Sequence, residues 1–442
     1  VIGARSALFA PLADPGLLIV DEEHDTAFKQ EAGLRYNARD LAVVRAKLAG
    51  ATVLLGSATP SVQSLHNAHS GRFVHLQLGA RIENRPLAEV EMVDLKAQPH
   101  LSGVQRYLSR PLFKAIAETL AREEQVLLFL NRRGFSGHAV CQSCGHAVRC
   151  SHCDVAMTLH QAEQQFKCHY CGYSQAARNP CPNCGGAKLI HLGIGTERLE
   201  RMMATAFPQA RVARLDRDTA RPKGALRKTL QRLRRRKIDI LIGTQMVAKG
   251  HDFPYITLVG IVCADLSLHF PDFRAGERTF QLLAQVAGRA GRGERPGRVI
   301  LQTYSPDHFI LQSAQAQRMQ PFYAREIEYR RALAYPPFSR LALLLISGRN
   351  QRQVAQRSGT LAQIARQMVT GKGDYGGAVQ VLGPVAAPLS RISDRYRYQI
   401  LLKGASSRKL RDFLLQLLAR WRDLGKDPGV RLNFDIDPYS ML

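Results

Sequence analysis

Leu17-Leu18-Ile19-Val20-Asp21-Glu22-Glu23-His24 is a stretch in which four apolar residues run straight into three acids and a histidine. A short and wholly apolar run predicts a strand that is buried on both faces, as the strands of parallel sheets are. The acids then lie at the carboxyl end of the strand, where α/β proteins collect their ligands. We therefore expect an α/β architecture with a ligand site beyond this strand.

Three further segments repeat this design. In each of them an apolar run is followed at once by a polar or glycine-containing segment: residues 52–55 and 56–60, 125–130 and 131–134, and 238–242 and 243–245. Helical periodicity lies between the runs, as at Leu112, Ile116 and Leu120. The alternation of strands and helices predicts parallel sheets that are covered by helices.

The last part of the chain, from about residue 341, has a different pattern. We interpret it as strand, helix, strand, strand, helix, strand, which is typical of a small ferredoxin-like α+β domain. Its second helix is marked by an apolar stripe at helical spacing, formed by Leu410, Phe413, Leu414, Leu417, Leu418 and Trp421. A Tyr-Pro-Pro segment at residues 335–337 marks the approximate beginning of the domain.

The chain of 442 residues is strongly basic, with 62 Lys and Arg against 36 Asp and Glu and a formal net charge of +26. Such an excess indicates a polyanionic partner, nucleic acid first, although charge that only keeps a protein dissolved is the alternative. No apolar run reaches the roughly 18 residues that would cross a bilayer. The first residues lack a signal-peptide pattern, so we expect a cytoplasmic protein with reduced thiols.

Eight of the nine cysteines form four C-x₂-C pairs: Cys141 and Cys144, Cys150 and Cys153, Cys168 and Cys171, and Cys181 and Cys184. Two such pairs can complete a closed tetrahedral shell around one Zn²⁺ ion, so eight ligands predict two ions. Disulfides or redox chemistry are the alternative, which the repeated spacing in a reducing compartment disfavours. A closed shell leaves no open position on the metal, so both ions are expected to be structural. The nearby histidines, His169 among them, are expected on the surface.

The acids after the first strand are arranged as in a Walker B motif. Asp21 would hold the Mg²⁺ shell, and Glu22 would orient and activate the water that attacks the γ-phosphate of ATP. Acidic strand ends are also common without this role, so the pattern alone leaves both interpretations open.

Three later segments give these acids their context: residues 56–60 (Gly-Ser-Ala-Thr-Pro), residues 243–252, and residues 285–292 (Gln-Val-Ala-Gly-Arg-Ala-Gly-Arg). Together the four segments resemble motifs II, III, V and VI of superfamily 2 helicases, in the same order. With residues 3–7 and the cysteine pairs between motifs III and V, the chain resembles the PriA family (primosomal protein N′) of bacterial replication-restart DNA helicases over essentially its whole length.

The resemblance implies two RecA-like helicase lobes, the first of them incomplete in this chain. Residues 1–122 would be the remainder of lobe 1, with motifs II and III. Residues 123–310 would be lobe 2, with motifs V and VI and a two-zinc module inserted at residues 138–190. Residues 311–442 would be the C-terminal α+β domain. The family pattern also implies a nested pairing of the cysteines, in which the two outer pairs share one zinc ion and the two inner pairs share the other.

By the same resemblance, residues of both lobes would surround ATP and its Mg²⁺ ion. Arg289 and Arg292 would stabilise charge on the transferring phosphoryl group, although contact with DNA phosphates alone is the alternative. A second group would bind the nucleotide or couple its state to lobe closure: Glu23, His24, Ser57, Thr59, Asp252 and Gln285.

Between motifs II and III the resemblance implies a loop that senses single-stranded DNA, with Phe28, Lys29, Arg35, Tyr36 and Arg39. Aromatic rings stack on bases and basic side chains meet phosphates without reading the base sequence. Core packing is the alternative for Phe28, and Leu34 stands where the family often has tryptophan. In motif V, Thr244 would contact a DNA phosphate.

Two hypotheses of function follow. The first is an ATP-dependent DNA helicase that binds stalled or branched forks, or single-stranded DNA, and initiates primosome assembly, with primosome proteins and single-stranded-DNA-binding protein as partners by resemblance. The second is a non-catalytic scaffold that binds forks and recruits partners. A G-x-x-x-x-G-K-[ST] phosphate loop is absent from the 442 residues, so we expect that the chain lacks the beginning of lobe 1 and hydrolyses negligible ATP by itself. An RNA helicase is disfavoured by the resemblance alone.

Overall fold

The computed structural model describes the chain except for residues 32, 80–87, 99–106, 131–138, 154, 161–162, 178–180, 182, 187–188, 192–193, 217, 223, 248–252, 292–294, 372–374, 426 and 442. The chain divides into two units. Unit 1 consists of Val1–Leu76, Cys168–Tyr173 and Glu326–Leu442, and unit 2 consists of Gln77–Lys167 and Ser174–Arg325. Among the helices described, none is long and apolar enough to cross a membrane.

A six-stranded parallel sheet forms the centre of unit 2, with the strand order β10-β11-β4-β12-β13-β3. Its strands are β3 (Glu89–Asp94), β4 (Gln125–Phe129), β10 (Val212–Leu215), β11 (Ile240–Gly243), β12 (Ile256–Ile261) and β13 (Arg298–Thr303). Every residue of β4, β11 and β12 is buried, as the apolar runs predict for strands covered on both faces. The parallel architecture predicted for this part of the chain is confirmed.

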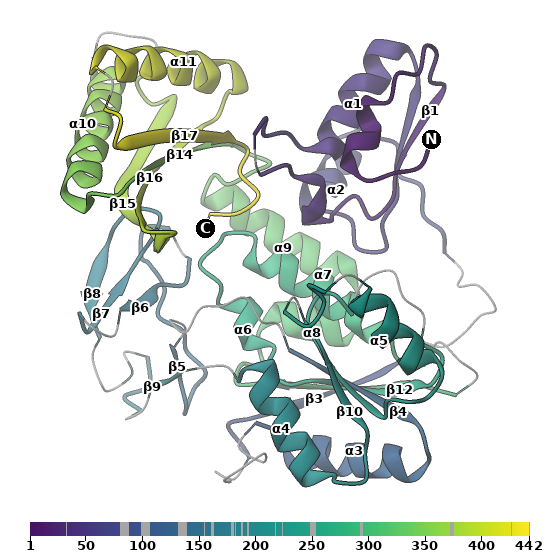
Figure 1. Cartoon of the computed structure of the whole chain (residues 1–442). Coiled ribbons are helices and arrows are strands. Elements are labelled where there is room, and N and C mark those ends of the chain that lie inside the picture. The colour runs from purple at the N-terminus through teal and green to yellow at the C-terminus, as the bar shows by residue number, and fades with distance from the viewer. Residues whose placement is uncertain are drawn as a thin grey trace. The chain divides into compact units, whose positions relative to one another are not determined.

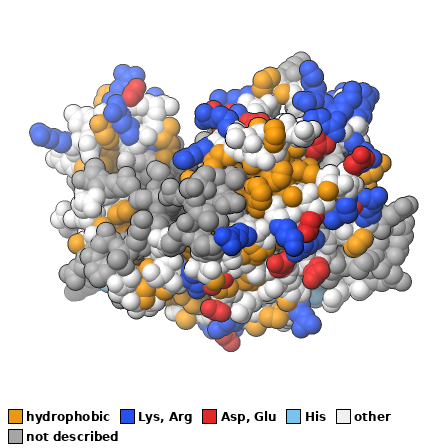
Figure 2. Space-filling model, turned by 90° about the horizontal axis from the view of Figure 1, so that it is seen from below, with side chains coloured by type: hydrophobic (Ala, Val, Ile, Leu, Met, Phe, Trp, Pro, Cys, Tyr) orange, Lys and Arg blue, Asp and Glu red, His pale blue; other side chains and the backbone are white. Residues whose placement is uncertain are grey.

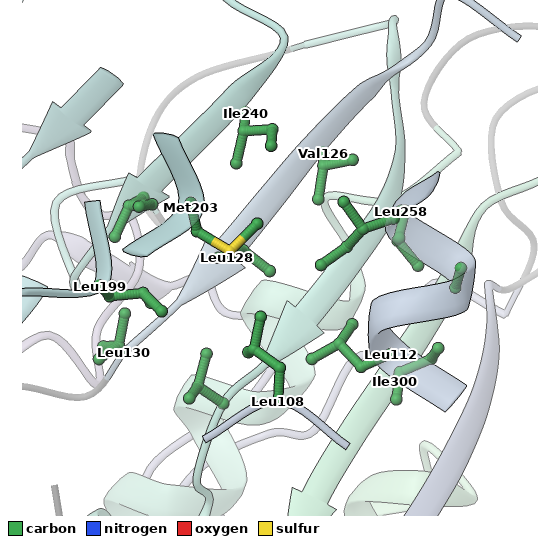
Figure 3. Close-up of a cluster of buried hydrophobic side chains, with 14 of the residues drawn as sticks. Leu108, Leu112, Val126, Leu128, Leu130, Leu199, Met203, Ile240, Leu258 and Ile300 are labelled. Carbon is green, nitrogen blue, oxygen red and sulfur yellow. The ribbon is translucent and has the colours of Figure 1, made fainter. Parts of the chain in front are cut away.

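Helices cover both faces of this sheet (Figure 1). They are α3 (Arg110–Ala121), α4 (Thr196–Ala206), α5 (Ala225–Arg234), α6 (Asp265–Leu268), α7 (Ala275–Ala287) and α8 (Phe309–Gln315), and α9 (Met319–Ala332) follows them. Figure 3 shows how Leu112 of α3 and Met203 of α4 meet Leu128 of β4 in one apolar cluster. All three side chains are almost fully buried, so burial of apolar surface holds the helices on the sheet.

The domain boundary expected at residue 122 is wrong. Strand β3 pairs in parallel with β13 over residues 89–94, and α3 packs into the same apolar cluster as β4. Both elements therefore belong to unit 2, which begins at Gln77. The error arose because β3 precedes the other strands of its sheet in the chain and reaches them only through tertiary pairing.

The cysteine module lies between β4 and α4 and is built from very short antiparallel strands. Strands β5 (Ala139–Cys141) and β9 (Leu189–His191) pair at its base, and β6 (Thr158–His160), β7 (Gln165–Lys167) and β8 (Ser174–Ala176) form a second small sheet. Val140 and Ala147 pack against Cys263, Leu266 and Tyr304 of unit 2. The module is thus an insertion whose first and last strands pair with each other.

In unit 1, β1 (Leu17–Val20) pairs in parallel with β2 (Thr52–Leu55). The elements around them are the 3-10 helices η1 (Arg5–Phe9) and η2 (Thr26–Phe28) and the helices α1 (Ala38–Ala49) and α2 (Val62–His69). In β1 only Val20 is buried, which differs from the expected burial on both faces. Because the described sheet has only these two strands, Ile19 is 63% exposed.

The C-terminal part of unit 1 is a four-stranded antiparallel sheet with two helices. Its elements follow in the order β14 (Arg340–Gly348), α10 (Gln351–Thr370), β15 (Val379–Ile392), β16 (Arg395–Gly404), α11 (Ser407–Asp423) and β17 (Val430–Ile436). The strand order β15-β16-β14-β17 is that of a ferredoxin-like domain, as the sequence predicts. The stripe on α11 faces the core, with Phe413 and Leu417 fully buried.

Two neighbouring leucines of α11 test this packing. Leu414 is 3% exposed within the core cluster, whereas Leu415 is 59% exposed. We expect Leu414→Ala to destabilise the domain by about 2–5 kcal/mol, because it removes buried methyl groups and leaves a cavity. We expect Leu415→Ala to change stability by less than about 0.5 kcal/mol. Urea unfolding followed through Trp421, the only tryptophan of the chain, measures both. Equal losses would contradict the assigned helix face.

Candidate nucleotide, zinc and DNA-contact sites

The turn after β1 carries the predicted Walker B acids. Asp21 and Glu22 are exposed, and the backbone N–H of Glu22 donates to Asp21 Oδ1 at 2.9 Å. Glu22 has a φ of 49°, in the left-handed region, which costs a non-glycine residue roughly 1–2 kcal/mol. Strained backbone of this kind gathers at functional sites, and here it turns two carboxylates outward at the strand end.

This turn is hydrogen-bonded to the segment after β2, which carries the predicted motif III. The N–H of Gly56 donates to the carbonyl of Val20 at 2.9 Å, and the N–H of Glu23 donates to the carbonyl of Gly56 at 3.0 Å. His24 Nδ1 lies 2.7 Å from Ser57 Oγ, and the same hydroxyl accepts from the N–H of Thr59 at 3.0 Å. The structure therefore brings together His24, Ser57 and Thr59, which the sequence analysis assigned to one coupling role.

Glu23 has a different place from the one expected. Its side chain is 1% exposed, and its carboxylate accepts from Arg39 at 3.1 Å, from the hydroxyl of Ser64 at 2.8 Å, and from the N–H and hydroxyl of Ser61 at 2.5 and 3.1 Å. A carboxylate with so many internal partners joins β1 to the first turns of α1 and α2. The expectation that Glu23 contacts nucleotide is corrected here, because its oxygens are already engaged within the protein.

Arg39, which the resemblance placed in the DNA-sensing loop, is the cationic partner of this carboxylate. It is 2% exposed and also pairs with Asp40 at 2.7 Å. Burial by itself lowers the pKa of Arg39. The opposing effect of Tyr439, Asp40 and Glu23 is larger, so the pKa of Arg39 lies above its ordinary value. The guanidinium is buried and permanently charged, so it does not face a DNA phosphate.

Sequence reasoning missed the two serines of this network. Ser61 is the N-cap of α2, and its hydroxyl accepts from the N–H of Ser64 at 3.2 Å. A serine that directly precedes an apolar helix start is a recognised capping signal, so Ser61 could have been found as a cap. Its bond to Glu23, a residue 38 positions earlier, could not.

Most of the predicted DNA-contact residues between η2 and α1 are engaged in contacts within the protein. Lys29 is 4% exposed and pairs with Asp435 at 2.7 Å, so it would meet DNA only after leaving this ion pair. The ring of Tyr36 lies edge-on to Phe9 at 5.1 Å between centroids, and Arg35 donates to the carbonyl of Phe434. Phe28 is half-buried at the end of η2.

The predicted residues of motifs V and VI lie in unit 2. Thr244 directly follows β11 and is buried, and its carbonyl accepts from the N–H of Val247 at 3.0 Å. Gln285 lies on the last turn of α7, whereas Arg289 lies in the turn beyond the helix end and is 8% exposed. Arg292 and Asp252 lie outside the described residues.

The eight paired cysteines form two clusters of four. Cys141, Cys144, Cys181 and Cys184 make the outer cluster, and Cys150, Cys153, Cys168 and Cys171 make the inner one; within each, all sulfur atoms lie within 4.8 Å of one another. The clusters agree with the nested pairing that the family resemblance implies. None of the nine cysteines, all of which the structure describes, is in a disulfide bond.

The backbone of the four knuckles is the same at every pair. The N–H of the first cysteine donates to the carbonyl five residues later, at 2.8–3.0 Å, in Cys141, Cys150, Cys168 and Cys181. Further N–H groups point at sulfur, as from Tyr170 to Cys168 and from Gly186 to Cys184, both at 3.4 Å. Four sulfurs held this closely, with N–H donors aimed at them, fit the thiolate shell of a structural Zn²⁺ ion.

Glycines make two of these knuckles possible in different ways. Gly145 has a φ of +73°, and a Cβ atom on it would lie 2.2 Å from the carbonyl oxygen of Tyr304. Gly172, with a φ of +84°, would meet only ordinary contacts with Val385. The left-handed turn favours glycine at both positions, and close approach to the end of β13 requires it at Gly145.

The expectation that His169 is a surface residue is wrong. It is 1% exposed, and its Nδ1 lies 2.9 Å from the carbonyl oxygen of Ala386 on β15. The carbonyl accepts only, so the histidine nitrogen is the donor. Gln399 in turn donates to the carbonyl of His169. This knuckle is therefore packed on the C-terminal sheet, a contact between residues more than 200 positions apart in sequence.

Basic side chains are gathered on part of the surface. Lys and Arg outnumber Asp and Glu on the face shown in Figure 2 and gather at its upper right. This agrees with the net charge of +26 and with a polyanionic partner.

Three family models match separate parts of the chain. The Primosomal protein N C-terminal domain matches residues 331–439, the PriA DNA helicase Cys-rich region domain matches residues 150–175, and the Helicase conserved C-terminal domain matches residues 187–294. These ranges contain the C-terminal sheet, the inner cysteines and three of the six strands of the unit 2 sheet.

Relatives match over the whole chain. It is 42% identical over 442 residues to the replication restart protein PriA of Bacillus subtilis (strain 168), covering 100% of this chain and 54% of that protein. It is 41% identical over 445 residues to the protein of the same name from Haemophilus influenzae, of which it covers 59%. The chain thus spans about half the length of these curated relatives.

Solved helicase structures resemble it only weakly. Dbp5 of S. cerevisiae bound to RNA and ADP BeF3 has a TM-score of 0.36 and 12% identity, covering 72% of this chain and 62% of that one. The fold assignment rests instead on the strand pairing described above. Three family models, and matches near 40% identity that cover the whole of this chain, lead to one conclusion: the chain belongs to the PriA family of replication restart proteins.

Proposed function

We propose that this chain supplies motor, zinc and DNA-contact residues of an ATP-dependent DNA helicase that restarts replication at stalled or branched forks and initiates primosome assembly. The observation that carries the proposal is the pairing of motifs II and III: Asp21 and Glu22 face outward on a turn that His24 and Ser57 join to the next strand. Primosome proteins, single-stranded-DNA-binding protein and a cytoplasmic location, where thiols stay reduced, belong to the same proposal.

The nucleotide chemistry would use groups of motifs II, V and VI. ATP would supply the phosphoryl group, and its Mg²⁺ ion would neutralise negative charge on the phosphates. Asp21 would hold the metal shell, and Glu22, which is half exposed, would orient the attacking water and accept its proton. Arg289 and Arg292 would stabilise charge on the transferring group, with Asp252 and Gln285 near the nucleotide.

Coupling would run through the contacts of the Walker B turn. His24 Nδ1 is 3.6 Å from Glu22 Oε2 and 2.7 Å from Ser57 Oγ. A movement of Glu22 at the nucleotide would therefore be transmitted to motif III through His24 and its hydrogen bond to Ser57. Thr59 is bonded to the same serine hydroxyl. The buried carboxylate of Glu23 would hold the turn rather than bind nucleotide.

DNA would be held without base recognition. The proposed contacts are Phe28, Arg35 and Tyr36 of the loop and Thr244 of motif V. The aromatic rings would stack on bases, and Arg35 and Thr244 would bind phosphates. The net charge of +26 supports a polyanionic partner. Binding should therefore weaken steeply as salt concentration rises.

The cysteine clusters would bind two structural zinc ions. Each cluster has four thiol ligands, all that a closed tetrahedral shell needs, and therefore no position for a catalytic water. The ions would supply folding energy to a module whose strands have only three residues each.

The second candidate function is a non-catalytic scaffold that binds forks and recruits partners. It is favoured for this chain by itself, because its 442 residues contain no phosphate loop. The test is DNA-stimulated ATP hydrolysis, measured in a protein that carries this chain together with a phosphate loop. Hydrolysis supports the motor, and its absence with intact fork binding supports the scaffold.

Two adjacent glutamates give a matched test of the roles assigned to motif II. In a protein that carries this chain together with a phosphate loop, Glu22→Gln should lower ATP hydrolysis by about 10²–10⁴-fold, because it removes the group that accepts the proton of water, and should leave DNA binding and stability unchanged. Glu23→Gln should lower the free energy of unfolding by roughly 3–5 kcal/mol, because Arg39 loses its buried partner. Steady-state hydrolysis and thermal unfolding separate the two effects. Equal loss of stability in both variants would contradict the assignment.

Three cysteine variants test the two zinc sites. Cys150→Ser should leave about one zinc ion per chain, because it breaks only the inner shell, and Cys181→Ser should do the same for the outer shell. Cys263→Ser is the matched control and should retain both ions, since Cys263 lies in neither cluster. Zinc content by mass spectrometry of the purified proteins measures this. Two ions remaining in the Cys150 variant would contradict the inner site.

A further inference from the structure

The loop that follows η2 is anchored at its base by the last strand of the chain. Lys29 Nζ is 2.7 Å from Asp435 Oδ1 and donates to the carbonyl oxygens of Ile436 at 2.9 Å and Asp437 at 3.2 Å. The ammonium group therefore donates two hydrogen bonds and has one carboxylate oxygen at ion-pair distance. A side chain expected to meet a DNA phosphate is instead buried and anchored to the end of β17.

A second anchor lies on the same strand. Arg35 Nη1 donates to the carbonyl oxygen of Phe434 at 3.1 Å. Strand β17 is an edge strand, with β14 on one side only, so the carbonyls of Phe434 and Ile436 on its other side need partners. The loop supplies them, and the edge of the C-terminal sheet is thereby covered by residues from the beginning of the chain.

The loop is hydrogen-bonded across its base and exposed at Leu34. Lys29 and Asn37 form an antiparallel bridge, and the N–H of Gln30 donates to the carbonyl of Tyr36 at 2.8 Å. Between them Leu34 is 79% exposed. A ligand can reach the tip while the base stays bonded to β17.

The base of the loop leads directly to the Walker B turn. Asn37 caps α1 by accepting from the N–H of Arg39 at 3.0 Å, and Arg39 is bonded to Glu23 at 3.1 Å. The ring of Tyr439, just beyond β17, lies 6.0 Å from the Arg39 guanidinium carbon. The C-terminal strand and its tail therefore touch both the start of the loop and the cation that holds motif II.

We infer that Lys29 and Asp435 are a positioning pair, through which the C-terminal strand fixes the base of the loop and makes motif II responsive to DNA bound at its tip. The coupling part of this inference rests on the proposed helicase function. The positioning part rests only on contacts within unit 1. Lys29 is buried, so removing the charge of Asp435 leaves the ammonium group without a charged partner where it is shielded from water.

Hydrogen exchange on the 442-residue chain tests the positioning part. In Asp435→Asn the amides of Lys29 and Gln30, which donate to the carbonyls of Thr26 and Tyr36, should exchange at least about tenfold faster than in the wild type, while those of β14 and β16 are unchanged. Arg340→Gln is the matched control, because Arg340 pairs with Asp437 at the same strand end but is 39% exposed, and it should leave the loop protected. An unchanged loop in Asp435→Asn would overturn the inference.

The coupling part is tested in a protein that also carries a phosphate loop. Asp435→Asn should lower DNA-stimulated ATP hydrolysis several-fold and leave the DNA-independent rate unchanged. The double variant Lys29→Met with Asp435→Leu fills the same space without charge and should recover both loop protection and stimulation. A loosened loop with full stimulation, or a protected loop without recovery of stimulation, would refute positioning as the role of the pair. If the wild type shows no DNA-stimulated hydrolysis, the proposed motor fails, and the exchange experiment still decides whether the pair holds the loop.

Discussion

The buried carboxylate of Glu23 is the constraint on which the arrangement of unit 1 depends. A carboxylate that is 1% exposed is tolerable only if its oxygens are paired, and here Arg39, Ser61 and Ser64 pair them. Their positions follow from this requirement: the first turns of α1 and α2 must both face the end of β1. Once Glu23 points inward, the turn presents Asp21 and Glu22 to solvent, and His24 reaches Ser57. One buried charge therefore orients the groups on either side of it.

The cysteine module solves a different problem, because its strands are too short to bury a core of their own. Each knuckle closes locally, with the first cysteine N–H bonded to the carbonyl five residues later, and brings its thiols toward a second knuckle. Such a shell is stable when a metal holds the four sulfurs together. The module packs on unit 2 through Val140 and Gly145. Because Gly145 has no side chain, its backbone can approach the end of β13 closely. The inner knuckle carries His169 onto the C-terminal sheet.

Charge in this chain has two separate uses. Most of the excess of Lys and Arg is on the surface, where it can meet a polyanion and where each ion pair contributes little. A few basic groups are buried with a defined partner, as Lys29 is with Asp435 and Arg39 is with Glu23. These pairs specify which segments meet. A basic residue in a loop that resembles a DNA-binding segment can belong to either class, and only its burial distinguishes them.

The sequence by itself determined the local elements and the chemistry of the ligands. Apolar runs predicted buried parallel strands in unit 2, the stripe ending at Trp421 predicted α11, and the cysteine spacing predicted eight thiol ligands, because each of these signals lies within a few turns of chain. The tertiary structure decided what is joined across long separations: β3 to β13, Glu23 to Ser61, and Lys29 to Asp435, 406 positions apart. Those contacts depend on which buried polar groups find partners when distant segments pack, and periodicity along one chain carries no information about that choice.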